Sequence, residues 1–185
     1  MTTGFVHGKM QNDGKRCIRA EQVMMSMRRV LISEDEPVTR RLLSASVGEW
    51  GYQVIATVDG KQAQEELMAR SVDVCILDWE MPRMTGIELC EWLRGANLHS
   101  EPYVILLTAR TKAEEIRVGY RAGANDYIGK PFVLEDLRRR LGVATQRIEC
   151  IEQVRSLAGA CDPVDLYRHD LSLYKKSRIK SIDQE

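Results

Sequence analysis

Short apolar segments alternate with segments of helical periodicity along the chain, and this alternation constrains the fold more than any other feature of the sequence. The apolar segments span residues 29–33, 52–58, 72–78, 103–108 and 125–129. The helical segments span residues 38–50, 60–70, 86–94 and 112–122, and a longer one begins at Leu134. Continuous apolar strands are typical of parallel sheets covered on both faces, and right-handed crossovers place the helices there. We therefore predict an α/β fold, a (βα)5 doubly wound five-stranded parallel sheet with an extended C-terminal helix.

For two of the predicted helices, the sequence indicates an end of the helix and the residues that face the core. Asp59 stands where a side chain caps the helix 60–70, and Gly51 ends the helix 38–50. Apolar residues three and four positions apart should point into the core. The residues expected to point inward are Leu42, Leu43 and Val47 in the first of these helices, and Ala63, Leu67 and Met68 in the second.

Composition excludes several classes of protein. The 185 residues carry 27 Lys plus Arg and 27 Asp plus Glu, so the formal net charge is zero and a nucleic-acid partner is not expected. No apolar run reaches the roughly 18 residues that span a bilayer, and residues 1–22 lack the apolar stretch of a secretory signal. We therefore expect a cytoplasmic protein with no membrane partner. The five cysteines form no CxxC pair, which excludes a paired zinc knuckle, and Cys75 should pack as a small hydrophobe.

The pattern divides the chain into three segments. Residues 1–28 are polar and basic and are expected to form a disordered lead; a nucleic-acid-binding arm is the less favoured alternative, because Phe5 is its one aromatic residue. Residues 29–146 carry the regular alternation and should form one domain. Residues 147–185 should form a helical extension and a tail without a complete output domain, since so short a segment cannot build its own core.

Polar residues follow the predicted strands at the points where they end. These residues are Glu34, Asp35 and Glu36 after the first strand, Asp78 at the end of the third, Thr108 at the end of the fourth, and Lys130 after the fifth. The carboxyl ends of parallel strands meet at one edge of the sheet, where such folds bind ligands. Carboxylates from two strands repel each other there unless a cation lies between them, and Mg²⁺ prefers oxygen ligands. Lysine and threonine beside them suit a phosphoryl group.

Four segments together resemble the receiver domain of two-component response regulators. They read VLISEDEPVTRRLL, VCILDWEMPRMTGIEL, VILLTAR and AGANDYIGKPF, and the resemblance covers residues 29–146. It implies the CheY-like variant of the flavodoxin-like fold and a phosphorylation switch that is not an enzyme, with only self-directed phosphotransfer and autodephosphorylation. It also implies a donor, which is a sensor histidine kinase or a phosphotransfer protein, and an unknown downstream protein.

The resemblance also implies roles for individual residues. Asp78 would be the phospho-acceptor, and Asp35 would ligate Mg²⁺ together with Asp78 and the backbone carbonyl of Glu80. Glu34 stands where the family more often has aspartate, so its longer side chain is expected either to hold the metal through water or to reach it differently. Lys130 would pair with a phosphoryl oxygen.

Three further expectations concern the switch and its lifetime. Thr108 would donate its hydroxyl to the phosphoryl group, and Tyr127 would be the aromatic residue that turns inward as Thr108 moves. The Lys130–Pro131 bond would be cis, as in the family. Glu80 and Arg110 each lie two residues beyond Asp78 and Thr108, and we expect them either to pair across the site and hinder hydrolysis or to be unrelated solvated charges.

The last helix carries a longer apolar seam than one domain requires. Its members are Leu134, Leu137, Leu141, Ala144, Ile148 and Ile151, and the first three should pack on the sheet while Ile148 and Ile151 lie beyond it. This spacing is typical of a coiled coil and suggests a homodimer through the last helix. The alternative is a helix that folds back onto its own domain.

Three other functions fit parts of the sequence. The segment LAGACDPVDLYRHD faintly resembles the lead-in to a diguanylate cyclase domain, so the chain could be the receiver portion of a truncated cyclase protein. A pseudo-receiver that binds partners without phosphorylation is the second alternative, for which Glu34 leaves some room. A haloacid-dehalogenase-like hydrolase ranks last, because it needs a second aspartate where this chain has Glu80.

Overall fold

The computed structural model describes residues 27–96, 98, 101–109 and 112–158. Its five strands are β1 (Arg29–Ser33), β2 (Gln53–Thr57), β3 (Val74–Asp78), β4 (Tyr103–Thr108) and β5 (Asp126–Gly129). All are parallel and lie in the order β2-β1-β3-β4-β5. The helices are α2 (Pro37–Glu49), α3 (Gly60–Ala69), α4 (Gly86–Gly95), α5 (Ala113–Ala122) and α6 (Leu134–Ala158). The predicted doubly wound α/β fold with a long last helix is confirmed.

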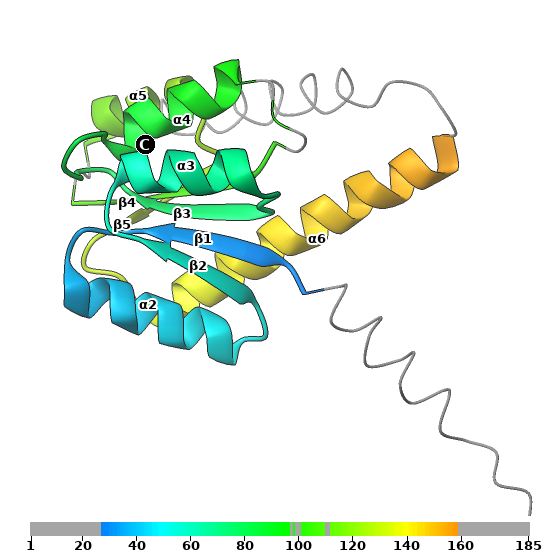
Figure 1. The fold of residues 1–185 in the computed structure, drawn as a ribbon, viewed down its shortest axis with the longest axis horizontal. Helices are drawn as coiled ribbons and strands as arrows, with labels where there is room; N and C mark the ends of the chain where they lie inside the picture. Colours follow the sequence, from blue (N-terminus) through cyan, green and yellow to red (C-terminus); the bar gives the residue numbers. More distant parts are fainter. Residues whose placement is uncertain (1–26, 97, 99–100, 110–111, 159–185) are drawn as a thin grey trace, which may run out of the picture.

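The helices form two layers around the sheet. Figure 1 shows α2 and α6 on one face and α3, α4 and α5 on the other. The chain winds outward in both directions from β1 and β3, so the crossovers alternate between the faces. This reversal of strand order lies between β1 and β3, which is where a doubly wound sheet opens a crevice at its carboxyl edge. Residues 1–26 of the predicted lead and residues 159–185 of the predicted tail lie outside the described residues.

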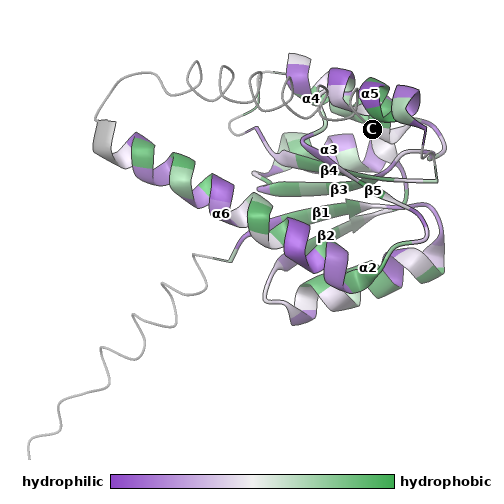
Figure 2. Ribbon diagram, turned by 180° about the vertical axis from the view of Figure 1, so that it is seen from behind, coloured by the Kyte–Doolittle hydropathy of each residue, from purple (hydrophilic) through white to green (hydrophobic). Residues whose placement is uncertain are grey.

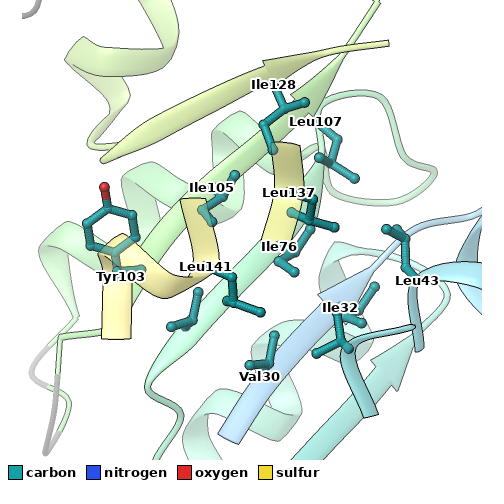
Figure 3. Close-up of a cluster of buried hydrophobic side chains, with 13 residues drawn as sticks. Val30, Ile32, Leu43, Ile76, Tyr103, Ile105, Leu107, Ile128, Leu137 and Leu141 are labelled. Atoms are coloured by element: carbon teal, nitrogen blue, oxygen red, sulfur yellow. The ribbon is translucent and has the colours of Figure 1, made fainter. Parts of the chain in front are cut away.

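The two faces of the sheet carry separate apolar clusters because successive side chains of a strand point to opposite sides. On the α2 and α6 side, Val30 and Ile32 of β1 are fully buried, and Leu137 of α6 packs into the same cluster (Figure 3). On the other side, Leu31 and Cys75 pack beneath α3 and α4. Burial raises the pKa of the Cys75 thiol well above its usual range, so this cysteine is a packing residue, as predicted.

Two helical residues that were expected to point inward are exposed. Leu42 of α2 is 49% exposed and Met68 of α3 is 64% exposed, whereas Leu43 and Leu67 next to them are buried. The sheet covers only part of the apolar face of each helix. The apolar residue at the edge of that face is therefore left exposed to solvent. Helical spacing alone does not decide which of two adjacent leucines or methionines is covered.

The long last helix packs on its own domain further than expected. Ile148 lies against the cluster formed by the strands, α2 and α6, which corrects the prediction that it lies beyond the sheet. Arg28 holds the next turn: its guanidinium donates to both carboxylate oxygens of Glu152, at 2.7 and 2.5 Å, and to Asp73 at 3.2 Å. Figure 2 shows hydrophobic and hydrophilic residues alternating along this helix. Within the described part of the chain, none of the helices has the length and apolar character needed to cross a membrane.

We expect Arg28→Ala to loosen the last turns of α6. The substitution leaves the Glu152 carboxylate without its bidentate partner, and Glu152 is half exposed, so the effect should be ~1 kcal/mol or a fewfold faster exchange. Hydrogen exchange of the amides of residues 148–156 measures it. Arg139→Ala is the matched control, because Arg139 pairs with Asp136 on the same helix at 71% exposure. Unchanged exchange in Arg28→Ala would contradict the contact.

Candidate functional site

Three carboxylates converge at the carboxyl edge of the sheet. Glu34 directly follows β1 and is 1% exposed, Asp78 is the last residue of β3 and is 7% exposed, and Asp35 is exposed. One carboxylate oxygen from each of the three lies within 4.8 Å of the others. A cluster of oxygen donors at this spacing suits a hard divalent cation such as Mg²⁺ better than a soft metal, which prefers sulfur or imidazole.

Lys130 brings the positive charge to this cluster. Its ammonium Nζ lies 2.9 Å from Oε2 of Glu34 and 2.9 Å from Oδ2 of Asp78. The residue follows β5, its backbone N–H donates to the carbonyl of Thr108 at 2.6 Å, and the bond to Pro131 is cis, as the resemblance to receiver domains implies. Lys130 therefore bridges carboxylates that come from two different strands.

The charges of the site do not balance within the protein. With Glu34, Asp35 and Asp78 ionised, three carboxylates face the single ammonium of Lys130, which leaves two negative charges. Burial raises the pKa of Glu34, an effect that the ion pair with Lys130 opposes and repulsion from Asp78 reinforces. Burial alone would lower the pKa of Lys130, but its bonds to Glu34 and Asp78 raise it. The arrangement holds its ammonium charged and favours a further cation.

We expect Glu34→Gln to stabilise the metal-free chain at neutral pH by ~1 kcal/mol, a gain typical of relieving a functional site. A carboxyl with a raised folded pKa binds its proton more tightly when folded. Stability therefore falls as pH rises from the unfolded value, about 4.3, through the folded pKa. Glutamine removes this loss and keeps an oxygen that can accept from Lys130. Thermal unfolding in EDTA should therefore show that Glu34→Gln gains more stability at neutral pH than at a pH near the unfolded pKa of the carboxyl.

Glu36→Gln provides the control for Glu34→Gln. The Glu36 carboxylate caps α2 by accepting from the backbone N–H groups of Thr39 and Val38, and these bonds lower its pKa. Its stabilising effect is present above the unfolded pKa and is lost as pH falls through the folded one. Glu36→Gln should therefore lower stability at neutral pH, opposite in sign to Glu34→Gln. If Glu34→Gln changes stability equally at neutral pH and near the unfolded pKa, the raised pKa of Glu34 is contradicted.

The loop between β3 and α4, residues 79–85, is attached to the sheet at several points. The N–H of Trp79 donates to the carbonyl of Leu107 at 2.8 Å, and the N–H of Gly86 donates to the carbonyl of Trp79 at 3.0 Å. Met81 is buried, and its sulfur accepts from the hydroxyl of Ser33 at 3.1 Å. The residue between these attachments is Glu80, whose side chain is exposed. Its backbone is thereby held next to Asp78.

Of the remaining predicted residues, Thr108 lies at the same edge, and Tyr127 lies further back in the sheet. Thr108 is the last residue of β4 and is 1% exposed. Tyr127 lies opposite Leu106 in the register of β4 and β5, and its half-buried side chain packs on the cluster beneath α3 and α4. Arg110 lies outside the described residues, so its pairing with Glu80 stays a prediction.

Sequence reasoning missed Arg83, a residue of the β3–α4 loop. Its φ of 65° lies in the left-handed region that side chains other than glycine rarely adopt. Its guanidinium pairs with Asp59, the cap of α3, through Nε at 2.8 Å and through Nη2. No local pattern could have indicated this pair, because the two residues lie 24 positions apart.

Comparison with known proteins decides the family. The response regulator receiver domain matches residues 30–142. The chain belongs to this family. Among curated relatives, the response regulator MprA of Mycobacterium tuberculosis (strain H37Rv) is 35% identical over 130 residues, which cover 70% of this chain and 56% of MprA. The phosphate regulon transcriptional regulatory protein PhoB of Rhizobium meliloti is 32% identical over 150 residues, 81% of this chain and 65% of PhoB. The receiver chain thus spans less than two thirds of both relatives.

Solved receiver structures share the fold. The chemotaxis protein CheY4 of Vibrio cholerae has a TM-score of 0.61 at 30% identity, covering 64% of this chain and 99% of CheY4. The receiver domain of the sensor histidine kinase PA1611 of Pseudomonas aeruginosa has a TM-score of 0.60 at 27% identity, covering 65% and 99% of the two chains. That structure holds a magnesium ion coordinated in its active-site cleft. The chain is therefore a CheY-like receiver of the two-component response regulators.

Proposed function

We propose that Asp78 accepts a phosphoryl group and that residues 29–146 act as a phosphorylation switch. The observation that carries the proposal is the cluster of Glu34, Asp35 and Asp78 with the ammonium of Lys130 placed 2.9 Å from Asp78. Asp35, Asp78 and the backbone carbonyl of Glu80 would hold Mg²⁺, and Glu34 would contact it through water. The metal, when bound, neutralises charge on the phosphoryl oxygens.

The chemistry required of the chain is a single displacement. An oxygen of the Asp78 carboxylate forms a bond to the phosphorus of a phosphohistidine, and the bond from phosphorus to the imidazole nitrogen breaks. The electron pair of that bond leaves with the imidazole of the donor. Lys130 offsets charge on a phosphoryl oxygen, and the Thr108 hydroxyl donates a hydrogen bond to another. Water later hydrolyses the acyl phosphate, and no other substrate is turned over.

The switch follows from the new charge on Asp78. A phosphoryl group adds roughly two negative charges and three acceptor oxygens. Thr108 is drawn toward them, and Tyr127 turns inward into the space that the threonine leaves. Because Tyr127 belongs to β5, its movement changes the shape of the surface formed by α5, β5 and α6. An unknown downstream protein reads this change.

The partners follow from the same proposal. The donor is a sensor histidine kinase or a phosphotransfer protein, because both carry phosphohistidine. Leu137, Leu141 and Ile148 of the predicted seam pack on their own domain, so a homodimer through α6 would have to use Ile151 or residues outside the seam. PhoB is named a transcriptional regulatory protein, and contact with nucleic acid is not proposed for the residues described here.

The test is intact-mass spectrometry after incubation with acetyl phosphate, once with Mg²⁺ and once with EDTA. The wild-type chain should gain one phosphoryl group with Mg²⁺ and none with EDTA, because the carboxylate charge that Lys130 leaves uncompensated repels an incoming phosphate when no metal is bound. Circular dichroism confirms that the protein is folded in both samples. A folded chain that gains no phosphoryl group with Mg²⁺ present would overturn the proposal in favour of a pseudo-receiver.

A further inference from the structure

We infer that Arg83 is a positioning residue that holds the β3–α4 loop, and with it the backbone carbonyl of Glu80, in place for the divalent cation. The inference rests on the proposed function, since it concerns the metal site of Asp35 and Asp78. It begins from the backbone of Arg83, whose φ of 65° costs on the order of 1 kcal/mol in a residue with a side chain. Such a conformation persists only where other contacts impose it.

The contact that imposes it is the ion pair with Asp59. The Asp59 carboxylate is 3% exposed, and its two oxygens have separate partners. Oδ1 accepts from the backbone N–H groups of Lys61 and Gln62, at 2.9 and 3.0 Å, which caps α3. Oδ2 accepts from the Arg83 guanidinium. Burial alone would raise the pKa of Asp59, but these donors lower it, so the carboxylate stays ionised. Asp59 therefore ties the loop to the first turn of α3.

A close backbone approach supports the same attachment. A Cβ at Gly60, the first residue of α3, would lie 2.3 Å from the carbonyl oxygen of Met84. Only glycine allows α3 to approach the loop this closely. Residues 83 and 84 are thus pressed against α3, while Met81 is held by Ser33 of β1. Glu80 lies between the buried end of β3 and these attachments, so the direction of its carbonyl depends on them.

A preformed carbonyl matters because a cation binds most tightly where its ligands need not be reorganised. If Arg83 is lost, the left-handed backbone has no ion pair to impose it, and the loop can relax away from α3. Asp35 and Asp78 are unaffected by such a change, because Asp78 is the last residue of β3 and Asp35 lies in the turn after β1. The expected consequence is weaker metal binding with the carboxylates intact.

The experiment compares Mg²⁺ binding and loop protection in unphosphorylated protein. Arg83→Asn keeps a residue that tolerates positive φ but removes the guanidinium, and Arg83→Lys retains a cation that can reach Asp59. We expect Arg83→Asn to weaken Mg²⁺ binding about tenfold in calorimetry and to speed exchange of the amides of residues 80–84. Arg83→Lys should recover most of both losses.

The matched control is Arg70→Asn, which removes an arginine of similar exposure, 51% against 58%, from its ion pair with Glu66 at the other end of α3. It should bind Mg²⁺ as the wild type does. Asp59→Asn keeps a capping oxygen, and combined with Arg83→Asn it should add little to the single loss. If Arg83→Asn binds Mg²⁺ with the affinity of the wild type, or if the amides of residues 80–84 exchange at the wild-type rate, the inference fails and the proposed function stands. A wild-type chain that binds no Mg²⁺ overturns the proposed function and the inference together.

Discussion

Asp78→Asn is expected to take up no phosphoryl group from acetyl phosphate under conditions in which the wild-type chain takes up one. The amide oxygen of asparagine is a far weaker nucleophile than a carboxylate, and its NH₂ group places a donor beside the ammonium of Lys130. The substitution preserves volume, and Asp78 is nearly buried, so the fold should be retained. Intact-mass spectrometry measures the loss, and peptide mapping of the wild type locates the modified residue.

Asp73→Asn is the matched control for this prediction. Asp73 lies just before β3, at the opposite end of the strand from Asp78, and accepts from the N–H of Arg29 at 2.7 Å. Asparagine can keep that bond, so the control should fold and take up one phosphoryl group. A phosphorylated Asp78→Asn chain would show that another carboxylate is the acceptor, with Glu34 and Asp35 of the same cluster as the candidates.

Gly86→Ala should destabilise the chain by ~3 kcal/mol or more, the upper range for overpacking a buried site. A Cβ at residue 86 would lie 2.2 Å from the carbonyl oxygen of Asp78 and 3.0 Å from its carbonyl carbon. Both atoms belong to backbone that the sheet holds, so neither can move aside cheaply. Because the displaced group is Asp78 itself, phosphoryl uptake should fall along with the melting temperature, which should drop by roughly 10 °C.

Gly142→Ala tests whether the effect at Gly86 is steric. Gly142 lies in the middle of α6, and a Cβ there would have no described neighbour within 4 Å. Alanine should therefore stabilise the helix by about 0.5–1 kcal/mol through its higher helix propensity. Thermal unfolding followed by circular dichroism compares the two variants. A melting temperature of Gly86→Ala equal to that of the wild type would contradict the close approach.

The order of the elements and the chemistry of the strand ends could be read from local sequence. A fully buried parallel strand is apolar on both faces, so VLIS and VCIL are distinct from the helices around them. Once the strands are parallel, their carboxyl ends must lie on one edge. Glu34, Asp78 and Lys130 were therefore expected to meet, and the structure brings them together. The predicted roles of these residues await the experiments above.

Long-range packing decided what local sequence could not. The rotation of α2 against the sheet exposes Leu42 beside the buried Leu43, and the end of α6 is held by Arg28, which lies 124 positions earlier. Both depend on neighbours that become adjacent only after folding.

The sequence by itself determined the strand and helix order and the polar residues at the strand ends, because these depend on the side-chain periods of two and 3.6 residues and on parallel pairing. The tertiary structure alone decided that Lys130 bridges Glu34 and Asp78, that Arg83 adopts a left-handed backbone against Asp59, and that Ile148 packs on its own domain. These contacts join residues far apart in the chain, and their geometry depends on how helices and loops pack on the finished sheet.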